Sequence, residues 1–136
     1  MRAFKEALEA HDLEAMLATL ADDVVFRSPA VHTPYAGKPA TSVILAAVNT
    51  VFEGFRYTRV IESGADSVLV FEAHVGDKQL EGADFIHVNE AGLIDDFRVM
   101  IRPLKGLHAV VDGMAEAIPT AMKQLGVGPE QMKPAR

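Results

Sequence analysis

Apolar residues recur with two different periods along the chain of 136 residues. In residues 2–20 and again in residues 41–52 they are spaced three or four positions apart, which is typical of amphipathic helices. Asp12 interrupts the first of these segments, where its side chain can cap the start of a second short helix. A third helical pattern fills residues 104–125, although Pro119 is expected to kink or end this helix.

Between the helical segments the pattern changes to the alternation that is typical of β-strands. A short strand is predicted at residues 24–26, and the prolines and the glycine of AVHTPYAGKP, a little further on, indicate a loop. Four longer strand-like runs follow one another, at residues 55–63, 67–75, 79–88 and 93–101. The short links SGAD, GDK and NEAG join neighbouring runs as antiparallel partners.

This order of elements predicts an α+β fold. We expect a strongly curved antiparallel sheet, covered on one face by the N-terminal helices, the middle helix and the C-terminal helix. Residues 1–125 are expected to form this single domain. The remaining tail, residues 126–136, has little to bury and is expected to be flexible.

One carboxylate, that of Asp84, interrupts the apolar face of the predicted sheet. If the GDK and NEAG links set the expected register, this face is otherwise built from apolar residues and glycine. The opposite face mixes apolar, charged and histidine side chains, a composition suited to water or to a partner subunit. The residues assigned to the inner face with Asp84 are Leu69, Phe71, Ala73, Val75, Leu80, Gly82, Ile86, Val88, Phe97, Val99 and Ile101.

The composition excludes several kinds of chemistry. The chain has no cysteine, so disulfides, thiolate nucleophiles and sulfur-ligated metals are ruled out. With 13 Lys and Arg against 19 Asp and Glu, the formal net charge is −6, and no basic run offers a surface for nucleic acid. No segment has the roughly 20 apolar residues of a transmembrane helix, and the charged N-terminus is unlike a secretory signal. We therefore expect a cytoplasmic protein without a membrane partner.

The motifs of several enzyme classes are also missing. There is no GxSxG, GxGxxG or GxxxxGK pattern, so acyl-enzyme chemistry and nucleotide binding lack their usual signatures, and no cofactor is expected. Ser28 is expected to be only a loop or cap residue. No metal site is expected either, because His74 and His87 do not lie opposite each other in the predicted sheet and a third ligand is missing.

Three segments of the sequence carry a family resemblance. DLEAMLATLADDVVF, SPAVHTPYAGKPA and FEAHVGDKQLEGADFIHVNEAGLIDDFRVMIRPLKGL resemble the SnoaL-like branch of the nuclear-transport-factor-2-like superfamily, over roughly residues 1–125. The resemblance implies a cone in which helices close a curled sheet over a ligand pocket, and commonly a homodimer paired through the outer sheet face. Ketosteroid isomerases, scytalone dehydratases, limonene epoxide hydrolases and SnoaL-type polyketide cyclases look like relatives, as do binding domains without catalysis, so fold alone does not select the chemistry.

Asp84 is the candidate general base or ligand anchor. In an apolar cavity its ionised form loses hydration, its pKa rises, and it can take a proton near neutral pH. Alternatively, Asp84 is a structural carboxylate that pairs with Arg102, Arg98 or a backbone amide. Arg102, at the end of the last strand, could face inward toward Asp84 or an anionic substrate, or lie in water at the rim.

Two further candidates come from the loop after the first strand, which lies near the pocket mouth in the cone that the resemblance implies. Tyr35 or His32 could donate a hydrogen bond to a developing oxyanion or act as the acid. Either could equally be a packing or surface residue. The walls of the pocket are expected to include Phe71, Phe97, Val99, Leu17, Val48 and Phe52.

These expectations lead to one hypothesis and two alternatives. The hypothesis is a homodimeric, cofactor-free isomerase, cyclase or dehydratase that uses Asp84 in acid/base chemistry on a small, mostly apolar polyketide-, steroid- or terpenoid-like compound. The alternatives are a non-catalytic binding domain, in which Asp84 orients a hydroxyl or amine, and a protein-interaction module that uses the outer face. A raised pKa beside open volume favours catalysis, whereas a buried salt bridge without a cavity favours a structural role.

Overall fold

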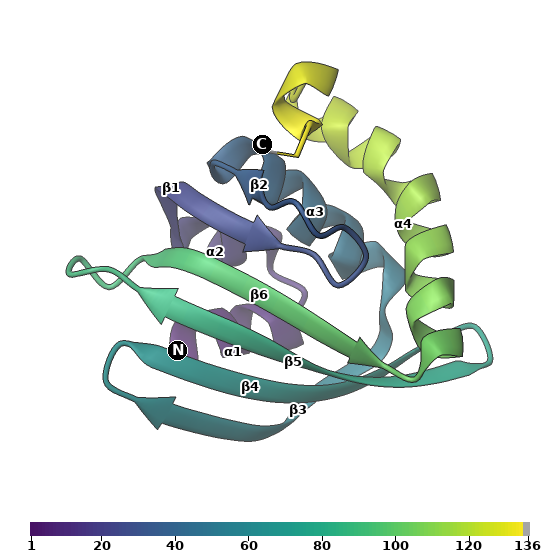
Figure 1. Cartoon of the computed structure of the whole chain (residues 1–136), viewed down its shortest axis with the longest axis horizontal. Coiled ribbons are helices and arrows are strands. Elements are labelled where there is room, and N and C mark those ends of the chain that lie inside the picture. Colours follow the sequence, from purple (N-terminus) through teal and green to yellow (C-terminus); the bar gives the residue numbers. More distant parts are fainter. Residues whose placement is uncertain (135–136) are drawn as a thin grey trace.

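Six strands form one curved sheet, and four α-helices cover one side of it (Figure 1). The computed structural model describes residues 1–134. The helices are α1 (Arg2–Glu9), α2 (Leu13–Ala18), α3 (Lys38–Val51) and α4 (Leu104–Leu125). The strands are β1 (Leu20–Arg27), β2 (Tyr35–Ala36), β3 (Glu53–Ser63), β4 (Asp66–Val75), β5 (Lys78–Val88) and β6 (Ile94–Arg102). The predicted α+β class and the predicted curved sheet are confirmed.

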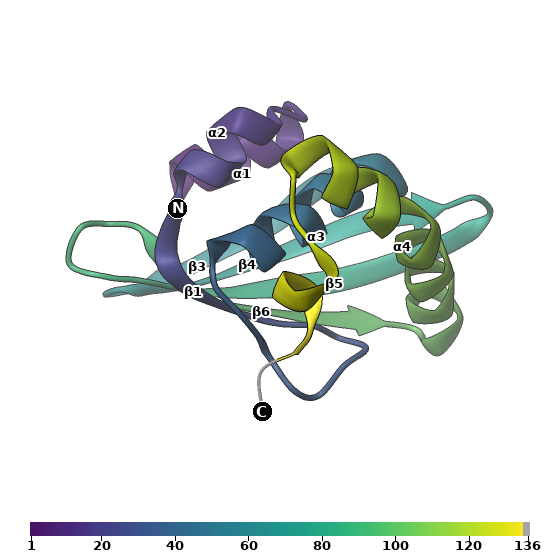
Figure 2. The same cartoon turned by 90° about the horizontal axis from the view of Figure 1, so that it is seen from above.

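The strand order is β2-β1-β6-β5-β4-β3, and one pairing differs from the expectation. Strands β3 to β6 form the predicted antiparallel meander, but β1 runs parallel to β6. The sheet is therefore mixed, not wholly antiparallel. The reason is the crossover through α3, which carries the chain over the sheet to its far edge, so that the meander returns to β1 in the same direction (Figure 2).

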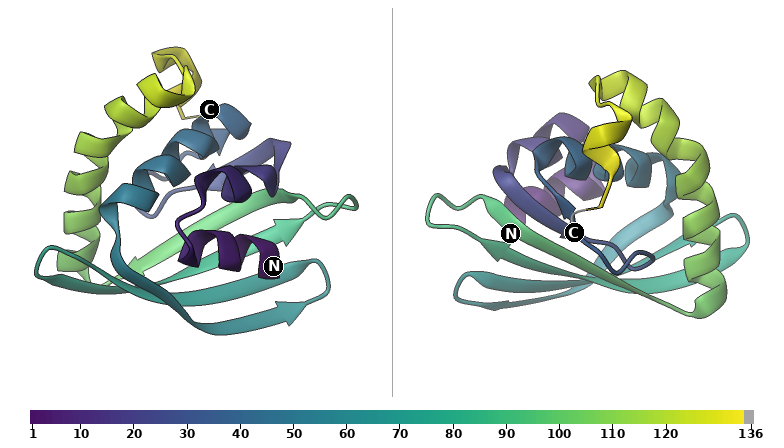
Figure 3. Two further views of the ribbon diagram at one scale, coloured as in Figure 1. Left: turned by 180° about the vertical axis from the view of Figure 1, so that it is seen from behind. Right: turned by 45° about the horizontal axis from the view of Figure 1, so that its top comes forward.

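The register of β4 with β5, and of β5 with β6 around Asp84, is the predicted one. Asp84 lies opposite Leu69 on β4 and opposite Val99 on β6, and Gly82 lies opposite Phe71. These residues share the face that the helices cover, and the opposite face of the sheet is left open by the helices (Figure 3). The ring of Phe71 packs directly over Gly82, where a side-chain carbon would also come within 2.7 Å of the Met100 carbonyl oxygen, so this position requires glycine.

The helix boundaries follow from local chemistry. The side chain of Asp12 accepts a hydrogen bond from the Ala15 amide at 3.1 Å and caps α2, as predicted. Pro119 was expected to kink or end the last helix, but α4 continues to Leu125 and curves along its length (Figure 1). Tertiary packing holds this part of α4 in place, because Ala121 is buried against Ala46 and other small residues of α3. No described helix is long and apolar enough to cross a membrane.

The segment after α4 is partly ordered against the domain. Residues Pro129–Met132 form a short 3₁₀-helix, η1, and the Met132 side chain packs against the core. The prediction that this tail has little to bury does not account for Met132. Residues 135–136 lie outside the described part of the chain.

Candidate functional site

A cavity of about 250 Å³ lies between the inner face of the sheet and the helices. Its walls come from α1, the end of β1 and the loop that follows, β2, α3, β3 to β6 and α4. Apolar and aromatic side chains dominate these walls, and the lining residues with a polar side-chain group are Asp84, Ser28 and Tyr35. Of the predicted wall residues, the cavity is lined by Phe71, Phe97, Val99, Val48 and Phe52.

Asp84 lies on the inner face of β5 and is 4% exposed. Its Oδ2 accepts a hydrogen bond of 2.7 Å from the hydroxyl of Tyr57, which reaches over β4 from β3. None of the side-chain hydrogen bonds of the described residues involves Oδ1 of Asp84, yet no buried polar side-chain atom among them is without a partner. Oδ1 is therefore not sealed by protein atoms, and it opens onto the cavity that Asp84 lines.

Burial raises the pKa of Asp84 to about 7, and the hydrogen bond from Tyr57 partly offsets this rise. No described Arg or Lys forms an ion pair with Asp84, so no positive charge counteracts the effect of burial. The protonated and the ionised carboxyl are therefore both populated near neutral pH. Burial and the charge of Asp84 raise the pKa of Tyr57, so its phenol stays neutral and remains a donor.

Aromatic rings fix the position of the Tyr57 phenol. The ring of Phe55 meets the Tyr57 ring edge-on, with 4.9 Å between their centroids, and stacks on Phe71 at 4.9 Å. Phe52 packs against both Phe55 and Phe71. Because packed rings leave the phenol little freedom, the carboxyl of Asp84 is held in one orientation relative to the cavity.

Tyr35 and His32, the two candidates in the segment after β1, lie in different places. Tyr35, on β2, is half-buried and lines the cavity. His32 is exposed and does not line it. Of these two candidates, the structure brings Tyr35 to the cavity and leaves His32, the other alternative considered, on the surface.

Two other expected site residues lie elsewhere. Arg102 faces outward, with its side chain 74% exposed, and its Nη1 lies 3.4 Å from Oε1 of Glu81, its neighbour on β5. Of the two positions considered for Arg102, inward toward Asp84 or exposed at the rim, the structure shows the exposed one, because alternation along β6 turns Ile101 inward and Arg102 outward. Leu17, on α2, packs against the core cluster but does not line the cavity.

Tyr57 and Ser28 are the site residues that the sequence analysis missed. The register between β3 and β4 shifts between Tyr57 and Arg59, and this irregularity turns Tyr57 to the inner face. Simple alternation counted back from the Ser63–Asp66 pair would have placed Tyr57 outside. Ser28 follows the end of β1 directly, and no enzyme motif surrounds it.

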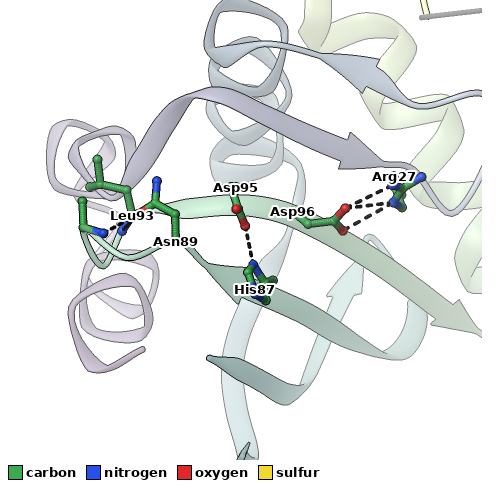
Figure 4. Close-up of polar contacts among 7 residues, drawn as sticks. Arg27, His87, Asn89, Leu93, Asp95 and Asp96 are labelled. Carbon is green, nitrogen blue, oxygen red and sulfur yellow. Dashed lines mark hydrogen bonds and ion pairs between the residues drawn. The ribbon is translucent and has the colours of Figure 1, made fainter. Parts of the chain in front are cut away.

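The outer face of the sheet carries ion pairs between charged side chains (Figure 4). His87 Nδ1 lies 2.6 Å from Oδ1 of Asp95, which raises the pKa of His87, and Arg27 pairs with Asp96 at 3.1 Å. Asn89 at the neighbouring turn accepts a hydrogen bond from the Leu93 amide. Among residues 1–134 no group of three or more His, Asp and Glu side chains is arranged to hold a metal ion.

Comparison with known proteins identifies the family. The chain matches the SnoaL-like domain over residues 1–97. A steroid delta-isomerase from Pseudomonas aeruginosa is 42% identical, with 87% of this chain and 88% of that chain covered and a TM-score of 0.82. A bacterial protein with a cystatin-like fold from Silicibacter pomeroyi is 34% identical, with 93% and 89% covered and a TM-score of 0.85.

Similarity at lower identity supports the fold alone. An NTF2-like protein from Mesorhizobium loti is 17% identical, with 76% of this chain and 88% of that chain covered and a TM-score of 0.68. No protein of curated function is significantly similar to the chain. The match to the family over most of the chain, on a fold with the same architecture, shows that this protein belongs to the SnoaL-like domain family.

Proposed function

We propose that the cavity binds a small, mostly apolar carbonyl compound and that Asp84 transfers a proton on it without a cofactor. One observation carries this proposal: a carboxyl group with a pKa of about 7 has one oxygen held by Tyr57 and the other open to an apolar cavity. A general base works best when its pKa lies near the operating pH. The neutral phenol orients the carboxyl without fixing it in one protonation state.

The reaction that suits this arrangement is an isomerisation. The ionised Asp84 takes a proton from the carbon between a ketone and an isolated double bond, which leaves an enolate and a protonated Asp84. The same carboxyl returns the proton to the far end of the double-bond system, so the double bond moves into conjugation with the ketone. No atom is gained or lost and no electrons leave the substrate. Apolar walls keep water from protonating the intermediate.

The size of the cavity suits a compact multi-ring substrate. A single ordered water, which has one non-hydrogen atom, needs roughly 10–15 Å³ of cavity volume. By this measure, the cavity of about 250 Å³ accommodates on the order of 20 non-hydrogen atoms. A steroid- or terpenoid-like skeleton falls in this range. The 42% identity with a steroid delta-isomerase supports the same class of substrate for this chain.

The test is a spectrophotometric assay with a β,γ-unsaturated 3-ketosteroid, whose conjugated product absorbs in the ultraviolet. We expect turnover that rises with pH through about 7, as Asp84 ionises. Asp84→Asn keeps the shape but cannot take the proton, and it should reduce kcat by about 10²- to 10⁴-fold. Arg102→Ala is the matched control and should leave kcat unchanged, because Arg102 lies on the outer face. A wild-type protein that binds the ketone without turnover would support binding alone.

We also propose that the outer face of the sheet pairs two copies of the chain. Ile61, Phe85 and Met100 lie on this face and are 48%, 36% and 53% exposed, and Ile61 and Phe85 both lie opposite Val68, so they belong to one exposed apolar patch of the kind that marks a protein interface. Phe85→Glu should convert a dimer into a monomer in analytical ultracentrifugation. Leu104→Glu, at an exposed apolar position on α4, is the control and should leave the dimer intact. A wild-type monomer at micromolar concentration would refute the pairing.

A further inference from the structure

We propose that the hydroxyl of Ser28 donates the hydrogen bond that holds the carbonyl oxygen of the ligand while Asp84 transfers the proton. This inference rests on the proposed function, because it assigns a further residue to the same cavity and reaction. From the sequence, the candidates for this task were Tyr35 and His32, and Ser28 was expected to have only a loop role. Two features distinguish Ser28 from these candidates: its hydrogen bonds and its place beside the sheet.

The hydrogen bonds of Ser28 leave only its donor free. Its Oγ accepts from the backbone amides of Ala30 at 3.0 Å and Val31 at 3.3 Å. A serine hydroxyl has two acceptor sites and one donor, so both acceptor sites are used within the loop. No described residue accepts the Ser28 proton, while Ser28 lines the cavity. The loop thus fixes the oxygen and leaves its O–H for a ligand.

Ser28 and Asp84 lie in one row across the inner face of the sheet. Phe26 on β1 lies opposite Phe97 on β6, and two residues further along β6, Val99 lies opposite Asp84 on β5. β1 and β6 run parallel, so Ser28, two residues after Phe26, comes level with Val99, two residues after Phe97. Ser28 lies directly after the end of β1. Ser28, Val99 and Asp84 all line the cavity, so the Ser28 and Asp84 side chains lie on the same side of the sheet, with Val99 between them.

The spacing of this row suits an enolisable ketone. Two strand spacings separate the backbones of Ser28 and Asp84 by about 9.5 Å. A reacting carboxylate oxygen lies roughly 3–3.5 Å from its carbon, the ketone oxygen lies about 2.4 Å from that carbon, and a hydrogen bond to serine adds about 2.8 Å. These contacts span about 8–9 Å in line, so one H–C–C=O unit bridges the two side chains.

Tyr35 is the competing donor, and its place in the sheet is less favourable. It lies opposite Phe26 on β2, the edge strand, so three strand spacings separate it from Asp84 and it lies one level away from the row. Its hydroxyl makes no hydrogen bond with a described side chain or backbone group that would fix its direction. The backbone of Ser28 is therefore nearer to that of Asp84, and the Ser28 hydroxyl is held in a fixed direction by its two hydrogen bonds.

The direct test is the infrared carbonyl band of a bound, ¹³C-labelled saturated 3-ketosteroid, which lacks the double bond and cannot isomerise. At about pH 9 Asp84 is ionised and cannot donate, so a shift of the band to lower frequency reports another donor. We expect the shift in the wild type and in Ser28→Thr, which keeps the hydroxyl. Ser28→Ala should move the band back toward its frequency in apolar solvent, and Tyr35→Phe should leave it shifted.

Turnover supplies a second readout. Removal of one oxyanion donor typically lowers kcat by about 10²- to 10³-fold, so Ser28→Ala should lower kcat by this amount with little change in KM, and Ser28→Thr should restore it. Binding of the same skeleton without its ketone controls for damage to the loop, and its affinity should be equal in wild type and Ser28→Ala.

The two proposals can fail separately. A band that is shifted in the wild type but not in Ser28→Ala, without turnover, would refute the isomerase and leave the Ser28 contact standing. Turnover with the same band and the same kcat in wild type and Ser28→Ala would overturn the inference and leave the isomerase standing. A band that moves only in Tyr35→Phe would assign the contact to Tyr35 and also overturn it. Failure of the wild type to bind the ketone would refute both.

Discussion

Asp84 should make the stability of the fold depend on pH in an unusual direction. The carboxyl has a pKa of about 7 in the folded protein, against an ordinary value of 3.8. Between these values the folded protein holds a proton that the unfolded chain has released, so the free energy of unfolding falls as pH rises. About 3 pH units at 1.36 kcal/mol each gives a contribution of about 4 kcal/mol, fully present below about pH 4 and lost above about pH 7.

Asp84→Asn isolates this contribution. Asparagine is neutral at every pH used, has nearly the same shape, and can still accept the Tyr57 hydrogen bond through its amide oxygen. The other titratable groups are present in both proteins, so their effects largely cancel in the difference. Between about pH 4.5 and about pH 8.5, the stability of Asp84→Asn relative to wild type should rise by about 3 kcal/mol.

Urea unfolding followed by circular dichroism at several pH values measures this difference, provided that both proteins unfold in one cooperative step with similar m-values. A relative stability of wild type and Asp84→Asn that stays constant with pH would refute the reasoning. It would mean that the carboxyl titrates near its ordinary pKa and that it is not desolvated in the folded protein. The proposed role as a base near neutral pH would then lose its physical foundation.

Three other substitutions test contacts in the site and in the sheet. Tyr57→Phe removes the hydrogen bond that lowers the pKa of Asp84, so the midpoint of the pH–rate profile should rise by about 1–2 pH units, which NMR titration of the carboxyl can check. Gly82→Ala should lower the free energy of unfolding in urea by about 1–3 kcal/mol or more, because the new methyl group collides with Phe71 and the Met100 carbonyl oxygen. Gly128→Ala is the control: its methyl group meets no atom within 4 Å, so the free energy of unfolding should hardly change. Arg102→Ala should change stability by less than about 0.5 kcal/mol and leave ligand affinity unchanged in a binding titration.

The placement of Asp84 could be predicted from the sequence because it depends on local features. Strands β4, β5 and β6 are joined by short links, and a tight turn such as the one that pairs Val75 with Lys78 fixes which residues lie opposite each other. Once the register is fixed, strict alternation assigns the side chains around Asp84 on β4, β5 and β6 to a face. The same rule places Arg102 outside, next to the inward Ile101, so its proposed inward contact conflicted with the pattern that located Asp84.

The features that could not be predicted are non-local or irregular. The parallel pairing of β1 with β6 depends on the path of the chain through α3, and no short segment encodes it. Tyr57 reaches Asp84 only because the register of β3 slips between Tyr57 and Arg59, which alternation alone cannot show. Ser28 lies beyond the end of a regular strand, where its direction depends on two hydrogen bonds within the loop.

The energetics of Asp84 bear on the choice between a structural and a functional role. A structural carboxylate in a protein interior normally has a cationic partner or several hydrogen bonds that compensate for its lost hydration. Asp84 has one hydrogen bond, from a neutral phenol, and no ion pair with a described residue, so its ionised form lowers the stability of the fold at neutral and alkaline pH. A structural role does not explain an arrangement that weakens the fold and leaves one carboxyl oxygen open to a cavity. A base that must exchange a proton with a ligand needs both features, and the hydrogen bond from Tyr57 keeps the pKa near neutrality, where burial alone would raise it further.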